Sequence, residues 1–165
     1  PAGPTGPPGP STGSGIPIGS TTNINIDVSG VAITTGGAAT VVSFTLTNDI
    51  EQGLKDLPAA DIRFTLAQLS PGVDGGSSAW QSYITRDSGG LADAQADAER
   101  GSSGTFVDNG DGTYQYTFAS ALTDYPAGPV FDGAKTHRLG IEIRGGHADR
   151  AHLWVLPEPV LHRLT

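Results

Sequence analysis

Hydrophobic and polar residues alternate along much of the chain, and each alternating segment predicts a β-strand with one buried face. The clearest segment, 113–118, places three aromatic residues on one face and threonine and glutamine on the other. Residues 105–107 are β-branched or aromatic and also favour extended backbone. Between them, Asp-Asn-Gly-Asp-Gly at 108–112 contains the Asn-Gly and Asp-Gly pairs that supply positive φ angles in tight turns. The pattern predicts a β-hairpin over 104–118.

The same alternation predicts further strands along the chain. They cover residues 23–29, 31–35, 40–47, 62–69, 80–84 and 138–144. Residues 153–156 predict an edge strand that runs into a linker, because a Pro-Glu-Pro run follows directly. We expect Trp80 to pack against the core and residues 48–58 to form a polar loop that turns near Gly53.

Residues 91–100 are the one helix-like stretch. Four of its ten residues are alanine, and Leu91, Ala94 and Ala98 share a weak apolar face, so we expect a short helix or an ordered loop. Seven or eight short strands with Gly-, Pro- and Asn-rich turns predict an all-β fold. The expected architecture is an antiparallel Greek-key sandwich or split barrel of immunoglobulin-like type, with at most one short helix.

The composition supports a single loop-rich β domain. The chain has 165 residues, enough for one hydrophobic core, and its 24 glycines and 12 prolines together exceed a fifth of the total. We divide it into a collagen-like Gly/Pro/Ser-rich linker at 1–22, a β-sandwich domain at 23–156 and a C-terminal linker at 157–165. The glycine triplets end at Gly9, too early for a triple helix, so we expect a polyproline-II spacer there. An oligomerisation element is the alternative.

Charge and cysteine content exclude several classes of function. A net charge of −8 and a pI of about 4.7 argue against nucleic acid and against an anionic membrane, which would require a basic stripe. The chain has no cysteine, so it forms no disulfide or thiolate metal site and attaches no c-type haem, which needs Cys-x-x-Cys-His. No apolar run approaches the roughly 18 residues of a membrane helix, so we expect no direct membrane insertion. Methionine is absent even at position 1, so we expect the chain to begin at a processed or internal boundary.

Two patterns suggest metal binding, and each has a plainer interpretation. The segment 108–112 is rich in Asp, Asn and Gly, but Gly110 and Gly112 occupy the alternate positions where an EF-hand needs side-chain oxygens. The four histidines are haem or metal ligands or polar surface residues, and the second interpretation is favoured because no carboxylate lies beside them at a recurring metal spacing. They are His137, His147, His152 and His162. For His137 we expect a hydrogen bond to a neighbouring loop.

Catalytic and ligand-stacking patterns are equally weak. An acidic group could supply a catalytic pair for a sugar bond, although a solvated face is the plainer interpretation. Its members are Asp87, Asp93, Asp97 and Glu99. Trp80, Tyr83 and Tyr125 could form a carbohydrate- or flavin-stacking surface, but core packing explains Trp80 equally well. We therefore assign no catalytic, cofactor-binding or metal-binding residue and predict that the chain is not an enzyme.

Several segments together resemble a known family. Residues 104–119 read GTFVDNGDGTYQYTFA, preceded by RFTLAQLSPG and WQSYI and followed by KTHRLGIEIRGG. Over 24–146, in this order, they resemble the N-terminal haem-free β domain of the OmcA/MtrC family, the outer-surface decahaem c-type cytochromes of metal-respiring bacteria. The turn motif by itself is less specific, because DNGDGTY also occurs in filamin-type and bacterial immunoglobulin-like repeats.

The resemblance implies a Greek-key split β-barrel that acts as a non-catalytic scaffold or docking domain in extracellular electron transfer at the outer-membrane surface. The haems would belong to partner domains or chains of a multihaem cytochrome, and a mineral, a flavin or a neighbouring protein could contact the domain. A Gly/Pro tract in such proteins follows a lipidated cysteine, which implies an anchored N-terminus.

Other functions remain open on the sequence. A free-standing immunoglobulin-like adhesive or cell-surface module is the main alternative, and a glycan hydrolase that uses the acidic group is a distant third. The exposed edge strands of an open sandwich could also pair with a second copy of the chain.

Overall fold

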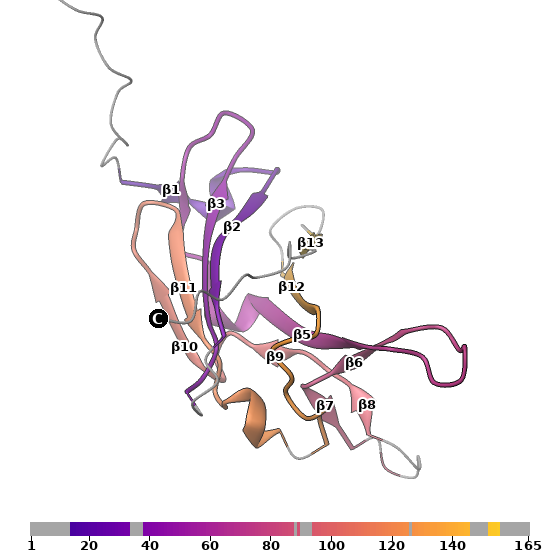
Figure 1. The fold of residues 1–165 in the computed structure, drawn as a ribbon. Helices are drawn as coiled ribbons and strands as arrows, with labels where there is room; N and C mark the ends of the chain where they lie inside the picture. Colours follow the sequence, from indigo (N-terminus) through magenta and orange to yellow (C-terminus); the bar gives the residue numbers. More distant parts are fainter. Residues whose placement is uncertain are drawn as a thin grey trace, which may run out of the picture.

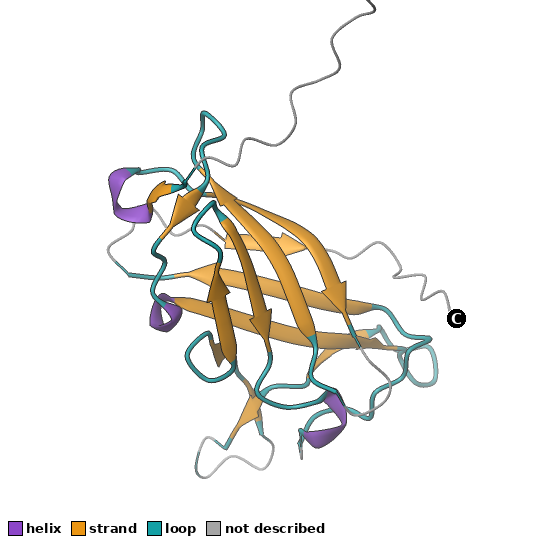
Figure 2. Ribbon diagram, turned by 90° about the vertical axis from the view of Figure 1, so that its left-hand side faces the viewer, coloured by secondary structure: helices purple, strands orange, loops and turns teal. Residues whose placement is uncertain are grey.

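Two antiparallel β-sheets face each other across a shared core in the computed structural model, which describes residues 14–33, 38–87, 89, 94–125, 127–145 and 152–155 (Figure 1, Figure 2). The first sheet, on the left of Figure 1, consists in spatial order of β10 (Thr105–Asp108), β11 (Thr113–Thr117), β3 (Val41–Thr47) and β2 (Asn25–Ala32). The second consists of β13 (His152–Val155), β12 (His137–Ile143), β5 (Ile62–Ser70) and β6 (Ala79–Ser82), and β9 (Glu99–Arg100) also pairs with β5.

Smaller elements connect and close the sheets. β1 (Ile16–Pro17) pairs in parallel with β4 (Leu54–Lys55), and β7 (Thr85–Arg86) pairs antiparallel with β8 (Gln95–Ala96). The helical residues among those described belong to three short 3₁₀ helices, η1 (Ile18–Ser20), η2 (Ala59–Asp61) and η3 (Leu122–Asp124). The predicted all-β antiparallel sandwich is confirmed.

Aromatic side chains join the two sheets in the core. Phe64 of β5 stacks on Tyr116 of β11 with ring centroids 4.1 Å apart, and it meets Phe44 of β3 edge-on at 6.0 Å. Phe44 in turn stacks on Tyr114 at 5.3 Å within the first sheet. All four residues are buried, as the alternation of their strands predicts.

The predicted hairpin is confirmed. β10 and β11 pair antiparallel from Thr105 opposite Thr117 to Asp108 opposite Tyr114. In the turn between them, Gly110 and Gly112 have φ angles of 80° and 97°, a region that side chains with a Cβ avoid. Asp111 accepts hydrogen bonds from the backbone N–H and the hydroxyl of Thr113, which fixes the entry into β11.

This turn packs backbone-to-backbone on two segments that are distant in the sequence. The N–H of Gly15 donates to the carbonyl of Gly110 at 2.7 Å, and that of Ile16 donates to the carbonyl of Gly53 at 2.9 Å. A Cβ on Gly53 would lie 1.9 Å from the carbonyl oxygen of Asp111, so glycine is required there. We call this three-segment junction the glycine junction. Ile18 is also buried, so residues within the range 1–22 belong to the folded body.

Four local expectations need correction. Residues 25–32 form one strand, because a bulge between Val28 and Gly30 absorbs the irregular alternation; residues 34–37 lie outside the described part of the chain. The segment 48–58 is not simply a polar loop, because it contains β4 and buries Leu54 and Leu57.

The third correction concerns Trp80, which does not pack in the core and is 39 % exposed. Trp80 lies opposite Leu69 of β5, whereas the inward residues of β5 are Ile62, Phe64, Leu66 and Gln68. This register turns Trp80 to the outer face of the second sheet. The chain then leaves β6, and Tyr83 and Ile84 enter the core in place of Trp80.

The fourth correction concerns 91–100. Residues 91–93 lie outside the described part of the chain, and the following residues form the short strands β8 and β9 instead of a helix or loop. β9 is fixed by pairing with β5, where Phe64 lies opposite Glu99 and Arg63 lies opposite Arg100. Tertiary pairing thus overrides the helical propensity of the alanines.

The expected edge strand near 153–156 is confirmed as β13, which pairs with β12 at one edge of the second sheet. Among the described residues, no helix has the length and apolar character needed to span a membrane.

Candidate functional site

One polar group in the interior is centred on Glu99, a buried acidic residue. Its carboxylate accepts hydrogen bonds from the hydroxyl of Tyr116, the backbone N–H of Ala119 at 2.8 Å and the hydroxyl of Tyr125 at 2.8 Å. The N–H of Gly104 donates to the Tyr116 oxygen at 3.1 Å. We call this group the Glu99 network. A carboxylate that is removed from water requires such donors, because an unpartnered one would be strongly destabilising.

The tyrosines of this network remain protonated. Burial raises the pKa of the Tyr116 hydroxyl, and the hydrogen bond to Glu99 raises it further. The same two causes, in the same order, raise the pKa of Tyr125. Both hydroxyls therefore act as hydrogen-bond donors and not as bases.

A second polar group lies at the other end of β5 and includes Gln68, Tyr83 and His137. The side-chain amide of Gln68 donates to the carbonyl of Val130 at 3.1 Å, and its oxygen accepts from the Tyr83 hydroxyl at 2.8 Å. Because this bond uses the only hydroxyl proton of Tyr83, the contact of 2.9 Å between Tyr83 and His137 requires that His137 Nε2 donates. The imidazole also stacks on the Tyr83 ring at 5.9 Å. We call this group the Gln68 network.

The expected bond from His137 to a neighbouring loop is confirmed, because Tyr83 lies in the segment between β6 and β7. Burial raises the pKa of Tyr83, with a smaller contribution from the negative charge of Asp132. The hydroxyl at the centre of the Gln68 network is therefore also protonated.

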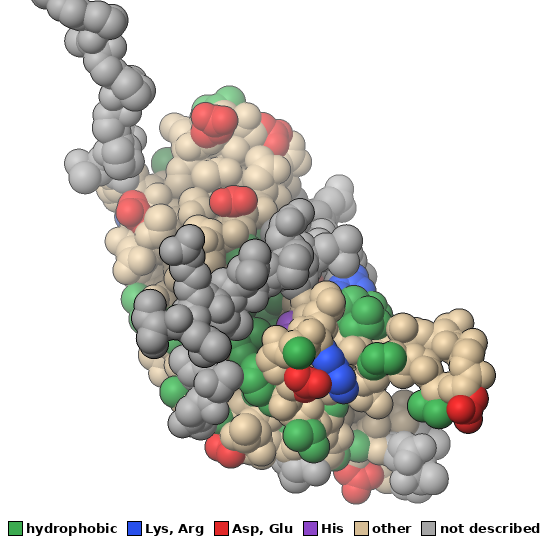
Figure 3. All heavy atoms as spheres, viewed as in Figure 1, with side chains coloured by type: hydrophobic (Ala, Val, Ile, Leu, Met, Phe, Trp, Pro, Cys, Tyr) green, Lys and Arg blue, Asp and Glu red, His purple; other side chains and the backbone are tan. Residues whose placement is uncertain are grey.

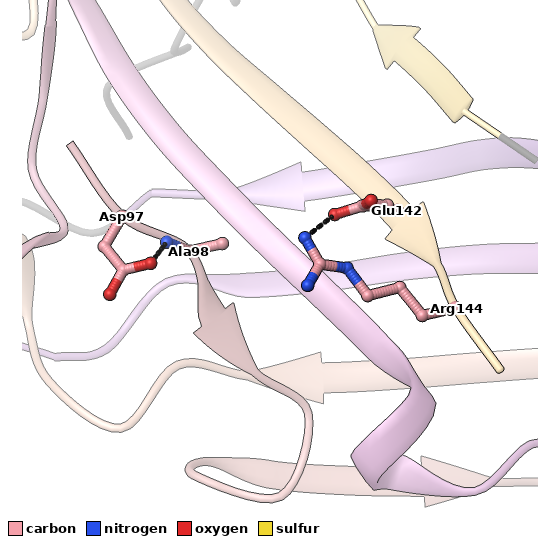
Figure 4. Close-up of polar contacts among 4 residues, drawn as sticks. All are labelled: Asp97, Ala98, Glu142 and Arg144. Carbon is pink, nitrogen blue, oxygen red and sulfur yellow. Dashed lines mark hydrogen bonds and ion pairs between the residues drawn. The ribbon is translucent and has the colours of Figure 1, made fainter. Parts of the chain in front are cut away.

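The predicted acidic group does not converge on one site. Asp87 is exposed and accepts from the N–H of Gly89 at 2.9 Å, and Asp97 is exposed and accepts from the N–H of Ala98 at 2.8 Å (Figure 4). Glu99 points inward instead, and Asp93 lies outside the described part of the chain. The three described acids thus serve local turns and one buried network.

The predicted aromatic surface is likewise divided. Tyr83 and Tyr125 belong to the two different buried networks, and Trp80 lies on the outer face of the second sheet near Arg138. These three rings do not form one stacking platform.

The remaining histidines add little to a metal hypothesis. His147 and His162 lie outside the described residues, and His152 belongs to β13, opposite Glu142 in the register. Within the described ranges, no group of three or more His, Cys, Asp or Glu side chains is placed to hold a metal ion. That the chain has no catalytic, cofactor-binding or metal-binding residue stays a prediction.

The sequence-based reasoning missed Gln68, although a signal was present. Residues 62, 64, 66 and 68 share the inward face of β5, so alternation places Gln68 in the core beside three large apolar residues. A glutamine at such a position requires partners, which here are the Val130 carbonyl and Tyr83.

The fold and these networks define a class of protein: an all-β antiparallel sandwich in which the buried side chains of Glu99 and Gln68 are engaged in internal hydrogen bonds. Residues 33–150 match the family of the decaheme cytochrome c component MtrC/MtrF N-terminal domain. The chain belongs to this family.

Solved structures agree with the family assignment. The crystal structure of the outer membrane decaheme cytochrome OmcA is similar with a TM-score of 0.67 and 25 % identity, over 87 % of this chain and 24 % of that one. The crystal structure of MtrC from Shewanella baltica OS185 is similar with a TM-score of 0.60 and 25 % identity, over 81 % and 21 % of the two chains. The present chain therefore spans about a quarter of the length of either protein. Among curated proteins, no significant match is found.

The family assignment places the haem chemistry outside these residues. The chain contains no cysteine and hence no Cys-x-x-Cys-His attachment site, so the haems of this family are carried by other domains.

Proposed function

We propose that the chain is a non-catalytic scaffold and docking domain of an extracellular multihaem cytochrome. The observation that carries the proposal is the family match over residues 33–150 in a chain that has no cysteine to attach haem. Electron transfer would then belong to the haem-bearing domains or chains, and this domain would hold or cover them.

The interior supports a structural role. Each polar network includes a hydrogen bond to the backbone, and the tyrosines of both networks are protonated. Satisfied networks of this kind fix the relative position of strands, which suits a rigid spacer. We further propose a linker within 1–22 that ends before Ile16, a β-sandwich domain that includes the folded residues Ile16 and Ile18 and continues to 156, and a C-terminal linker at 157–165.

We also propose a location on the outer-membrane surface. The similar protein OmcA is an outer membrane cytochrome, and the acidic surface of this chain suits an exported domain. Edge strands could also pair with a second copy of the chain. At the β2 edge of the first sheet the bulge between Val28 and Gly30 disfavours such pairing, because it interrupts the regular strand. Light scattering at high protein concentration would contradict that pairing by showing a monomer.

The proposal is tested by the intact mass and the haem content of the native polypeptide. We expect covalent haem on the same polypeptide or on one that co-purifies with it. A native protein without haem, purified free of any haem-bearing chain, would contradict the proposed function. A chain of repeated β domains would instead support an adhesive module.

A further inference from the structure

The turn between β10 and β11 contains a chemically reactive pair, Asn109 and Gly110. Among asparagine pairs Asn-Gly deamidates most readily, because glycine has no side chain to hinder attack by its own backbone nitrogen. The Gly110 nitrogen loses its proton, forms a bond to the Asn109 Cγ and expels the side-chain nitrogen as ammonia, which leaves a succinimide ring. Water then opens the ring to aspartate or isoaspartate. Asn109 is exposed, so water reaches the site.

In the folded turn both reacting groups are engaged by other partners. The N–H of Gly110 donates to Asp108 Oδ1 at 2.8 Å, and the side-chain amide of Asn109 donates to Thr113 Oγ1 at 3.0 Å. Ring closure requires the nitrogen of Gly110 and the Cγ of Asn109 to turn toward each other, so both hydrogen bonds must break first. Each of them lowers the fraction of chains in a reactive conformation.

The charge around the turn opposes the same step, because the attacking Gly110 nitrogen is negatively charged once its proton has left. The carboxylate of Asp108 lies against that N–H. Hydrogen bonds from Thr113 hold the pKa of Asp111 below its ordinary value, so this second carboxyl group is ionised at neutral pH. Figure 3 shows several acidic side chains over the end of the molecule where β1 and this turn lie. Nearby negative charges disfavour the formation of another one.

The glycine junction restrains the turn from outside. The N–H of Gly15 donates to the carbonyl of Gly110 at 2.7 Å. A Cβ on Gly15 would lie 2.9 Å from the carbonyl oxygen of Gly53 and 3.2 Å from that of Gly110, so the segments are in close contact. This contact restricts rotation of the backbone at Gly110, which the attack on Asn109 requires.

We propose that Asn109 is a latent deamidation site, and that the N-terminal segment docked through Gly15 protects it. When this segment leaves the turn, the backbone at Gly110 is free to rotate and the reaction proceeds. Isoaspartate adds one carbon to the main chain. The junction has no room for a longer turn, since a Cβ on Gly53 would already lie 1.9 Å from the carbonyl oxygen of Asp111. The modification therefore prevents the segment from docking again.

The protection is tested by ageing the full chain at neutral pH. Peptide mapping by mass spectrometry follows Asn109, and isoaspartyl methyltransferase labels the isoaspartate that forms. A synthetic peptide of residues 104–116 is the unprotected reference. We expect deamidation in the folded chain to be at least about tenfold slower than in the peptide, because two hydrogen bonds must break first. Equal rates would overturn the proposal.

Two glycine variants test the role of the N-terminal segment. Gly15→Ala crowds the junction, whereas Gly19→Ala is the matched control, because a Cβ on Gly19 meets nothing within 4 Å. We expect Gly15→Ala to deamidate about fivefold faster than the native chain and Gly19→Ala to stay within about twofold of it. Equal rates in the two variants would show that the segment does not protect Asn109. A chain that begins at Ile16 lacks the Gly15 donor, and it replaces Gly15→Ala if circular dichroism shows that this variant does not fold.

A third variant separates local opening from general unfolding. Gln68→Leu removes a hydrogen bond to Val130 in another part of the fold and leaves the turn intact. Because the unfolded fraction of a stable domain is very small, its deamidation rate should stay within about twofold of the native rate. A rate as high as that of Gly15→Ala would show that general unfolding controls the reaction, which would overturn the proposal.

The release of the segment is tested on the aged product by hydrogen exchange of the Gly15 and Ile16 amides, both of which donate within the junction. In chains with isoaspartate at position 109 we expect these amides to exchange at least about tenfold faster. Asn109→Asp adds the negative charge without the extra main-chain carbon, so it should keep them protected. Unchanged exchange in the isoaspartate form would overturn the proposed release.

Discussion

The two buried networks provide hydrogen-bond partners for polar side chains in the core in different ways. Both lie against β5, one through Glu99 opposite Phe64 and the other through Gln68. In the Glu99 network, three donors surround one carboxyl group. In the Gln68 network, hydrogen bonds connect His137, Tyr83, Gln68 and the Val130 carbonyl one after another. A carboxylate without its donors is far less tolerable in a protein interior than an amide, so we expect the Glu99 network to be the more critical of the two.

Alkaline pH should destabilise both networks at once, because each contains at least one tyrosine hydroxyl. All four tyrosines have a pKa raised above the ordinary value of 10.0, with burial as the first cause. The unfolded chain releases these protons near pH 10 and the folded chain retains them. The contribution of these tyrosines to the free energy of unfolding is therefore fully present below about pH 10. Above that pH the free energy of unfolding falls, by up to about 1.4 kcal/mol per pH unit for each tyrosine.

Tyrosinate absorbance and circular dichroism, followed together against pH, check this expectation. We expect tyrosinate to form only as the β signal is lost. Tyrosinate that forms near pH 10 in a folded chain would show that the hydroxyls are not protected.

Glu99→Ala should lower the free energy of unfolding by about 3 kcal/mol, because it leaves the Tyr116 and Tyr125 hydroxyls and the Ala119 N–H without their acceptor. Glu99→Gln keeps the shape and one acceptor oxygen and should lower it by roughly half as much. Urea unfolding measures both. Equal effects for the two variants would contradict this, because they would mean that the shape and the remaining acceptor oxygen of the side chain contribute nothing once the carboxylate is lost.

Gln68→Leu should be milder, lowering the free energy of unfolding by about 1–2 kcal/mol through loss of the partners of Val130 and Tyr83. Tyr83→Phe is the matched control, since it removes the hydroxyl and keeps the ring stacked on His137. If Gln68→Leu proved more damaging than Glu99→Ala, the ranking of the two networks would be reversed.

The smallest effect is expected for charges on the outer face of the same sheet. Glu142→Gln removes the ion pair with Arg144. The Arg144 side chain is 53 % exposed and that of Glu142 is 28 % exposed. Because exposed ion pairs contribute little, the free energy of unfolding should change by less than about 0.5 kcal/mol. Urea unfolding beside Glu99→Ala gives the comparison directly. A change as large as that of Glu99→Ala would show that the Arg144–Glu142 pair contributes as much to stability as the buried Glu99 network.

Alternation along single strands could predict much of the fold. It correctly predicted the hairpin, β3, β5 and β12, because each has one buried face and no bulge. It failed at Trp80, since the loop between β5 and β6 sets the register and the most apolar residue of the segment faces outward. It failed again at β9, a two-residue strand in an alanine-rich segment whose form is decided by pairing with β5.

The networks were beyond the reach of pattern alone. Periodicity indicates that Tyr116 points inward, but not that its hydroxyl meets Glu99, seventeen residues away. Tyr83 and His137 are separated by 54 positions, and their contact depends on how β5, β6 and β12 align. Such partners are fixed by tertiary geometry and leave no local signature in the sequence.

The glycine junction determines how the domain would respond to a pull on its N-terminal side. A tether attached before Ser14 would load the bonds from Gly15 to Gly110 and from Ile16 to Gly53 before it reached β2. The force would be shared by the tip of the hairpin and the turn that precedes β4, two segments more than fifty residues apart. A pull on that side would therefore act on two places of the sandwich at once and not on a single strand.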